Sequence, residues 1–425
     1  MDSQLALYIA LTHRADLRRT AAGLHRARGP APSTASPVPA LFAAMFAAQA
    51  GMLSLAPVLP DVADNFGMSA AAGGQLRTLG GLAGGTTAVA VALLGSRLRL
   101  RTMLTAGHLM LGLGALASAA APTVAVLAAG QAAVGAAAGL LIAGALAASV
   151  AWSRSGRRAR VLAAASLGQP MAWVAGMPLG GLLAELDWRY SLLGVPLVAS
   201  LVGTAALARL PRPARAAHAG RALRSLPTWA VPELLSYAAW SGVLVFAGAL
   251  LIESYSLSPA VVGLLLGGAA LAALPGNMLA RPWLAGHARE LLVLLGLAAA
   301  LLTALFGIVR PGAGASTAIL AALVLVACTR TVAGSALGLQ SAGERRLSAM
   351  GVRAATGQFG YLTGAGVGGV ALAAGGYELL GVSLSALFAL GTVPHLTAIY
   401  RTVTVRTALL PGKWSRSAGR SALKA

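Results

Sequence analysis

Twelve apolar stretches, each about as long as a bilayer is thick, alternate along the chain with short charged segments. About 20 helical residues cross the hydrocarbon core of a membrane. Lipid offers the backbone no hydrogen-bond partners, and the short alternating pattern of barrel strands is absent, so each stretch is predicted to be a helix. The stretches cover residues 39–57, 73–95, 103–121, 123–150, 160–184, 191–209, 229–252, 259–279, 291–309, 316–339, 352–374 and 379–400. We therefore expect an all-α membrane protein with twelve transmembrane helices.

The basic residues set the expected orientation in the membrane. Of the 32 Lys and Arg residues, 27 lie in the two tails and in the loops at 96–102, 151–160, 209–228, 280–290 and 341–353, and Arg401 lies just before the second tail. These segments alternate with loops that are poor in basic residues, as the positive-inside rule requires. Both termini are therefore predicted to be cytoplasmic. The net charge of +21 is spread over these loops. No soluble basic domain is left to bind nucleic acid.

The longest polar stretch inside the chain divides it into two similar parts. This stretch, 209–228, separates a predicted bundle at 38–208 from a second at 229–402, with basic tails at 1–37 and 403–425. Weak self-similarity links the two parts, because GQ and GG pairs recur about 189 residues apart, at 168 and 357 and at 180 and 368. Two pseudo-symmetric six-helix bundles around a central site are a transporter architecture. Shared glycine content alone is the alternative explanation.

Patterns for catalysis and metal binding are missing from the sequence. Cys328 is the only cysteine, so no disulfide within the chain and no cysteine-based metal site are expected. The six histidines have no paired spacing, and we find neither a phosphate-binding loop with its Lys nor a nucleophile elbow. We expect a protein that is not an enzyme, has no cofactor and acts as a monomer in the bilayer.

Residues 176–189, GMPLGGLLAELDWR, resemble the fifth-helix antiporter signature of the major facilitator superfamily. The matching residues are Pro178, Gly180, Gly181, Trp188 and Arg189, while Gly176 is displaced by one position. The resemblance covers about residues 38–402. Within the superfamily, the chain is most similar to the bacterial drug and sugar efflux branch, which includes arabinose-efflux-like and drug:proton antiporters. This resemblance implies the major facilitator fold, with a proton gradient as the energy source. A composition rich in Arg, Ala and Gly also hints at a bacterial source and its cytoplasmic membrane.

Small residues and prolines in the fifth and eleventh stretches are interpreted as sites of helix packing and bending. Pro170 and Pro178 interrupt the hydrogen-bond ladder, which is expected to bend the fifth helix where the halves meet. Glycines allow neighbouring helices to approach closely. The predicted packing glycines are Gly176, Gly180, Gly181, Gly364 and Gly368.

Two other family signatures are only partly present. The loop after the second helix keeps Arg97 and Arg101 as predicted gating residues, but Ser96 stands where the family has an acid. In the fourth helix, Gln131 stands where proton-coupled members carry an arginine, so it is predicted to lie at the substrate cavity or to act in coupling. The missing spacing of an arginine four residues before a glycine occurs instead at Arg330 in the tenth stretch.

Charged residues within a bilayer are costly, so the few that fall in apolar stretches are candidates for function. Arg330 is predicted to be a substrate counter-ion or gate, with a structural arginine bonded to backbone carbonyls as the alternative. Arg77 lies near the outer end of the second helix and is predicted to reach the surface. Glu233 follows Pro232 near the start of the seventh helix. We expect Pro232 at the first helical position and Glu233 in the first turn, where an acid stabilises the helix dipole. A role as a proton carrier is the alternative.

Three further residues are predicted to line a substrate cavity. Gln49 lies mid-way along the first helix, and Tyr237 and Trp240 are one turn apart on the seventh. Amide and aromatic groups can bind a partly apolar solute, although helix packing would explain Tyr237 and Trp240 as well.

These observations lead to one main hypothesis and one alternative from another class. The hypothesis is a secondary transporter that exports a small amphipathic solute, such as a drug, sugar or metabolite, by alternating access in exchange for protons. The loss of the acid at Ser96 and of the arginine at Gln131 leaves uniport open. It also motivates the alternative, a membrane receptor or assembly protein that keeps the fold without transport.

Overall fold

The computed structural model describes residues 36–94, 99–153, 157–210, 228–279, 287–341 and 346–408, and these are almost entirely helical. The first half contains α2 (Val38–Leu53), η1 (Ala56–Val58), α3 (Leu59–Asn65), α4 (Ala70–Leu94), α5 (Leu100–Ala119), α6 (Val124–Ala151), α7 (Arg158–Ser166), α8 (Gly168–Met171), η4 (Ala172–Gly176), α9 (Met177–Ala184) and α10 (Trp188–Ala208). The second half contains α11 (Ala230–Tyr255), α12 (Pro259–Ala270), α13 (Ala273–Leu279), α14 (Ala288–Ile308), α15 (Ala313–Ser341) and α16 (Arg346–Ala408).

The helices of the described residues form twelve rods, six in each half, which confirms the predicted fold class. Short segments combine into single rods at α2 to α3, α7 to α9 and α12 to α13. The long α16 is two rods, because Gly375 and Gly376 have non-helical backbone angles and Gly376 has a φ of +63°. By length and apolar composition alone, nine helical segments of the described part qualify as membrane spans, and one of these, Gly351–Tyr400, contains the break at the glycine pair.

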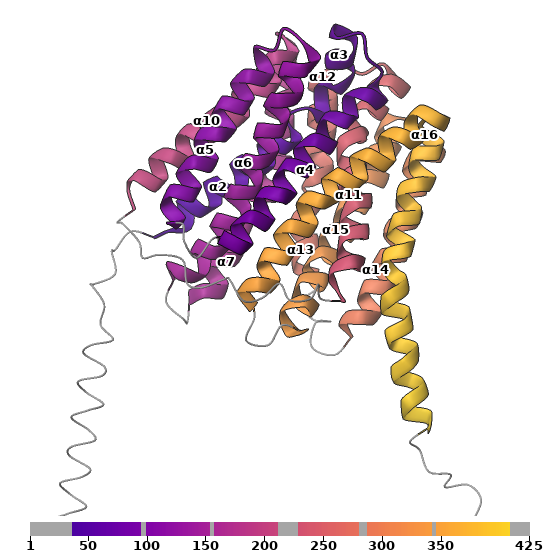
Figure 1. Cartoon of the computed structure of the whole chain (residues 1–425). Coiled ribbons are helices and arrows are strands. Elements are labelled where there is room, and N and C mark those ends of the chain that lie inside the picture. Colours follow the sequence, from indigo (N-terminus) through magenta and orange to yellow (C-terminus); the bar gives the residue numbers. More distant parts are fainter. Residues whose placement is uncertain are drawn as a thin grey trace, which may run out of the picture.

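Both ends of the described chain lie at the same end of the bundle (Figure 1). We name this the tail end, where α2 begins and α16 ends, and we name the opposite one the far end. The rods run nearly side by side and alternate in direction. Apolar side chains fill the interior, and many leucines and valines also face outward. An apolar outer surface suits a protein surrounded by lipid. The predicted boundaries of the linker and tails stay predictions, because 211–227 and both chain ends lie outside the described residues.

Equivalent contacts in the two halves show their pseudo-symmetry. A Cβ added to Gly181 on α9 would collide with the carbonyl oxygen of Pro259, at the start of α12. A Cβ on Gly369 in the first rod of α16 would lie 3.0 Å from the carbonyl oxygen of Ala71, at the start of α4. The offset is 188 residues in both cases, from 181 to 369 and from 71 to 259. The fifth and eleventh rods therefore cross the boundary between the halves in the same way, each against a rod of the other half.

The fifth rod departs from regular α-helix where the sequence has its prolines. Between α8, which contains Pro170, and α9, which has Pro178 in its first turn, the chain forms the π-helical turn η4. A proline removes one N–H donor, and a π turn accommodates the changed register of the remaining bonds. Trp173 lies in this turn and is buried. The interruption thus turns a large aromatic side chain towards the second half.

Arg101 contributes to the first half alone. Its guanidinium donates hydrogen bonds to the carbonyl oxygens of Leu210, at 2.9 Å, and Ala208, at 3.3 Å, which close the C-terminal end of α10. A cation at a helix C-terminus satisfies free carbonyls and the helix dipole. The side chain therefore ties α5 to α10, and the gating role predicted for it has no contact across the halves. Arg97 lies outside the described residues.

The far end is closed by a contact that crosses the halves. The Glu185 carboxylate, after α9, accepts a hydrogen bond of 3.0 Å from the backbone N–H of Ala260 in the first turn of α12. Hydrogen bonds from the Ser258 hydroxyl and from that N–H lower the pKa of Glu185 below its usual value of 4.5. The contact is therefore complete above this value and is lost as the pH falls through the lowered pKa.

Acidification is expected to weaken closure of the far end for the same reason. Spin labels at Leu186 and Val261, both exposed, report the separation of the two halves there. The label distance should widen at low pH in the parent protein and should be wide and independent of pH in Glu185→Ala. An equal response to pH in both proteins would show that another group controls closure.

Candidate functional site

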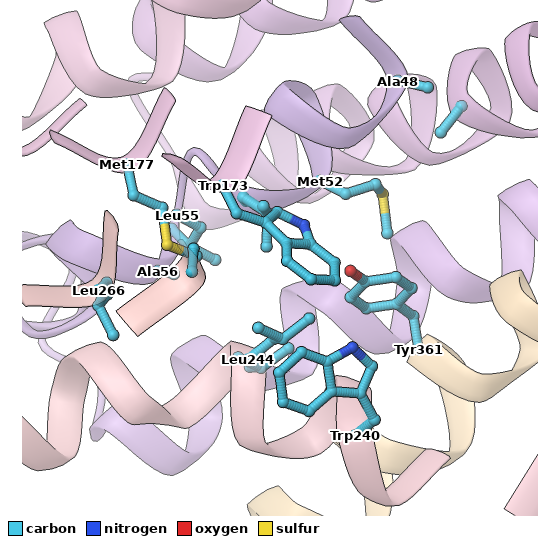
Figure 2. Close-up of a cluster of buried hydrophobic side chains, with 14 of the residues drawn as sticks. Ala48, Met52, Leu55, Ala56, Trp173, Met177, Trp240, Leu244, Leu266 and Tyr361 are labelled. Atoms are coloured by element: carbon cyan, nitrogen blue, oxygen red, sulfur yellow. The ribbon is translucent and has the colours of Figure 1, made fainter. Parts of the chain in front are cut away.

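Two tryptophans meet at the centre of the boundary between the halves. The rings of Trp173, from the π turn η4, and Trp240, from α11, have centroids 5.6 Å apart and planes inclined by 60°. Figure 2 shows them gathered with the ring of Tyr361 beside Met52 and Leu244. Tilted aromatic pairs at this separation stabilise one another beyond their buried area. The centre of the molecule is therefore a predominantly aromatic layer supplied by both halves.

Amide and hydroxyl groups join this layer from both halves. The Gln49 side chain on α2 donates a hydrogen bond of 2.9 Å from Nε2 to the hydroxyl of Tyr361 on α16. Gln169 on α8 donates a bond of 3.4 Å to the Gln49 carbonyl oxygen. Tyr237 packs edge-on against Tyr361 with centroids 6.3 Å apart, and the Arg353 guanidinium lies 4.9 Å from the Tyr237 ring centre. Polar groups thus lie next to apolar rings, as in sites that bind amphipathic molecules.

Arg77 extends into the same boundary, and the prediction that it reaches the surface is wrong. Only 1% of the residue is exposed, and neither terminal nitrogen has a hydrogen-bond partner within the described part of the chain. Its side chain lines a narrow gap with Met52, Leu244 and Tyr361, and the gap has no room for a water molecule. The side chain stays inside because it points towards the second half and not along α4 to the membrane surface.

A buried ion pair forms a second polar site, within the second half. Arg330 Nη1 on α15 lies 3.1 Å from Glu233 Oε1 on α11, and their side chains are 3% and 4% exposed. This distance makes an ion pair but no hydrogen bond, because Glu233 Oε1 accepts no hydrogen bond within the described residues. Arg330 Nε likewise has no hydrogen-bond partner there. Arg330 Nη2 also approaches the carbonyl oxygen of Pro232, at 3.5 Å. Each residue thus supplies the opposite charge that the other requires in a dry interior.

The sequence around this pair fits its geometry. α11 begins at Ala230, two residues earlier than expected, so Pro232 is its third residue and the predicted N1 position was wrong. A Cβ at Gly334, one turn beyond Arg330, would collide with the Glu233 carboxylate. A Cβ at Gly338 would lie 3.1 Å from the ring of Trp229. The glycines at this spacing make room for the acid and for a tryptophan.

Gln131, predicted to act in coupling, lies away from both sites. Its Nε2 donates a hydrogen bond of 2.9 Å to the Ser118 hydroxyl, which connects α6 to α5 inside the first half. The side chain is buried, and its carbonyl oxygen has no partner among the described residues. The contact stabilises the packing of two neighbouring rods and does not reach the boundary.

The predicted packing glycines differ in how closely a neighbour approaches. Added Cβ atoms would collide with the Ala238 carbonyl oxygen at Gly364 and would lie 2.8 Å from the Phe246 ring at Gly368. At Gly180 the nearest atom, the Ser191 hydroxyl, is 3.1 Å away. Gly176 differs, because its nearest neighbour would be 3.7 Å away, an ordinary contact. Close approach therefore requires glycine at Gly181 and Gly364 but not at Gly176.

Three members of the central layer were not predicted: Trp173, Tyr361 and the buried Arg77. Trp173 stands where the family signature has its first glycine, which is the one sequence signal for an unusual role there. Tyr361 lies three residues after Gln358 in the stretch that repeats the fifth helix. The described residues contain no group of three metal-ligating side chains.

Comparisons with known proteins agree with this architecture. The family model of the Major Facilitator Superfamily matches residues 41–232. No curated protein sequence matches the chain. Three solved structures share the fold. A D-xylose-proton symporter has 12% sequence identity and a TM-score of 0.64, and the match covers 84% of this chain and 95% of that one. A point mutant of the nucleoside transporter NupG has 14% identity and a TM-score of 0.65, with 86% of this chain and 98% of that one covered. The human organic anion transporter MFSD10, also called TETRAN, has 15% identity and a TM-score of 0.58, with 84% of this chain and 98% of that one covered. The chain thus has the fold of major facilitator transporters.

Proposed function

We propose that this protein is a secondary transporter of the major facilitator superfamily that exports a small amphipathic solute by alternating access. The observation that carries the proposal is the central layer, where Trp173 and Gln49 of one half meet Trp240 and Tyr361 of the other. A solute bound there would touch both halves, so movement of one against the other would change the side from which the solute is reached.

The contacts at the far end define the step that opens the pathway. Helix α9 packs on α12 through Gly181, and α11 packs on η1 where a Cβ at Gly248 would collide with the Ala56 carbonyl oxygen. Together with Glu185, these contacts form a surface that can separate without unfolding either half. The described rod ends that flank the basic segments of the sequence lie at the tail end. We therefore place that end in the bacterial cytoplasm and the far end outside. Export then requires the far end to open.

We propose that protons drive export through the pair of Glu233 and Arg330. Among the described residues, Glu233 is the only acidic side chain that is buried. A proton on its carboxylate would leave Arg330 without its counter-charge, and the pair would separate. This links protonation to the packing of α11 against α15. α11 also carries Trp240, so a change in its packing would reach the central layer.

Transport by the purified protein in lipid vesicles tests this function. A panel of apolar anions, cations and neutral solutes would be measured at two pH values, with and without a proton gradient. We expect at least one amphipathic solute to move faster than in empty vesicles, and a proton gradient to accelerate it. Trp240→Ala should lower this rate about tenfold or more through lost aromatic contact, while Tyr190→Ala, an exposed aromatic residue, should not. A protein that binds solutes but moves none would support a receptor.

A further inference from the structure

The buried Arg77 carries a positive charge that no acidic group of the described residues compensates. The described residues contain three ion pairs, and their arginines are Arg189, Arg310 and Arg330. Arg77 has none, and both Nη atoms lack hydrogen-bond partners within the described chain. Charged groups that are removed from water without a partner are strongly unfavourable. A buried charge of this kind marks a candidate functional site, where a bound ligand can supply the missing negative charge.

The surroundings of Arg77 suit an anion with an apolar body. Tyr361 lines the same gap. Its hydroxyl accepts the hydrogen bond from Gln49, which leaves its own proton free for an additional acceptor. The rest of the gap is lined by apolar side chains, from Met52 to Leu244. The rings of the two tryptophans lie beside Tyr361 and Leu244 (Figure 2). A guanidinium and a hydroxyl can hold the oxygens of a carboxylate, sulfonate or phosphate, while the rings bind the apolar body.

The second half supplies another positive charge along this boundary. Arg353 lies over the face of Tyr237, and the Tyr237 ring packs on Tyr361. The series from Arg353 through the two tyrosines to Arg77 therefore places a cation at each end of an aromatic row. An anion that moves along this row finds a favourable charge at both ends.

We propose that Arg77 and Tyr361 bind the anionic group of the transported solute, which is an organic anion with an apolar body. This inference rests on the proposed transport function and specifies its substrate class. The gap is closed in this conformation, with no room for a water molecule. The anion therefore enters when the halves separate, and the uncompensated guanidinium favours that separation when an anion is present.

Three naphthalene compounds of equal ring size test the charge of the solute. We would measure binding of 1-naphthoate, 1-naphthylmethanol and 1-naphthylmethylammonium to the purified full-length protein by equilibrium dialysis. The naphthoate should bind at least about tenfold more tightly than the other two, because a charge-assisted hydrogen bond contributes to its affinity alone. Binding of the naphthoate that is absent, or no tighter than that of the alcohol, would overturn the inference.

Arg77→Gln is the decisive variant. Arg310→Gln is the matched control, because Arg310 is a partly exposed arginine of the far end, with 29% of its side chain exposed. We expect Arg77→Gln to lose the preference for naphthoate by about 10- to 100-fold and to keep its affinity for the alcohol. Arg77→Lys should keep part of the preference, since the charge remains without the planar fork. The control should bind all three compounds like the parent protein.

Thermal stability separates this role from a structural one. If Arg77 binds a solute, the empty Arg77→Met protein should melt at a higher temperature than the parent, since an uncompensated buried charge has been removed. Naphthoate should raise the melting temperature of the parent only. A lower melting temperature for empty Arg77→Met would show that Arg77 holds the fold together, which would overturn the inference. Dialysis needs no transport, so absence of vesicle transport would count against the proposed function alone.

Discussion

Replacing Glu233 with Gln is expected to lower the free energy of unfolding by about 3–5 kcal/mol. The change leaves Arg330, which is 3% exposed, as a charge with no partner in a dry interior. The reverse variant, Arg330→Met, should be destabilising to a similar degree, because the carboxylate then stays buried alone. Both effects would be measured as chemical unfolding of the purified protein in detergent.

The double variant Glu233→Gln with Arg330→Met distinguishes a pair from two independent residues. If each charge matters only through the other, the double variant should recover most of the stability that either single change removes. Glu378→Gln is the control, because its ion pair with Arg310 is largely exposed and should change stability by less than about 1 kcal/mol. Losses that simply add in the double variant would contradict the pairing. The stable double variant would then show whether the proton response of transport requires Glu233.

A methyl group at Gly181 is expected to reduce transport about tenfold. In the closed far end, the Cβ of Gly181→Ala would overlap the carbonyl oxygen of Pro259, which belongs to backbone and cannot turn away. The three atoms nearest to this Cβ all belong to α12 of the other half. Packing within each half is therefore unchanged, and the protein should reach the membrane in normal amounts. The variant should spend more time with the far end open.

Gly176→Ala is the matched control on the same rod. Its Cβ would lie 3.7 Å from the nearest atom, so transport should stay within about twofold of the parent rate. Transport rates in vesicles, divided by the amount of inserted protein, compare the two variants. Equal losses in both would mean that the fifth rod tolerates no larger residue anywhere, and the special contact at Gly181 would then have no part in closure.

The fold followed from the sequence because a single physical requirement fixes it. A membrane helix needs about 20 apolar residues, and the sequence has twelve apolar stretches of about this length. Interruptions separate them, such as the helix-breaking pair Gly375–Gly376 in α16. The repeat of paired glycines also indicated the two halves, since Gly181 and Gly369 make equivalent contacts. Patterns of this kind are local in the chain, so they can be read without knowing which rods are neighbours.

Contacts between distant rods could not be predicted in the same way. Glu233 and Arg330 were each identified as candidates, but their pairing depends on how α11 packs against α15, which no spacing along the chain encodes. Arg77 lies about two turns after the first residue of α4, a position from which its side chain could reach the membrane surface. Only the rotation of α4 about its axis turns the side chain inward. The π turn at Trp173 depends on how the prolines are accommodated by the neighbouring rods.

Distances across both ends of the molecule test the central claim, which is that the two halves alternately open each end. Spin labels would be placed at Leu186 and Val261 at the far end, and in a second protein at Leu167 and Met278 towards the tail end, all exposed residues in a Cys328→Ala background. We predict that adding a transported solute or a proton gradient lengthens one distance and shortens the other. Distances that stay fixed, or that lengthen together, would contradict alternating access.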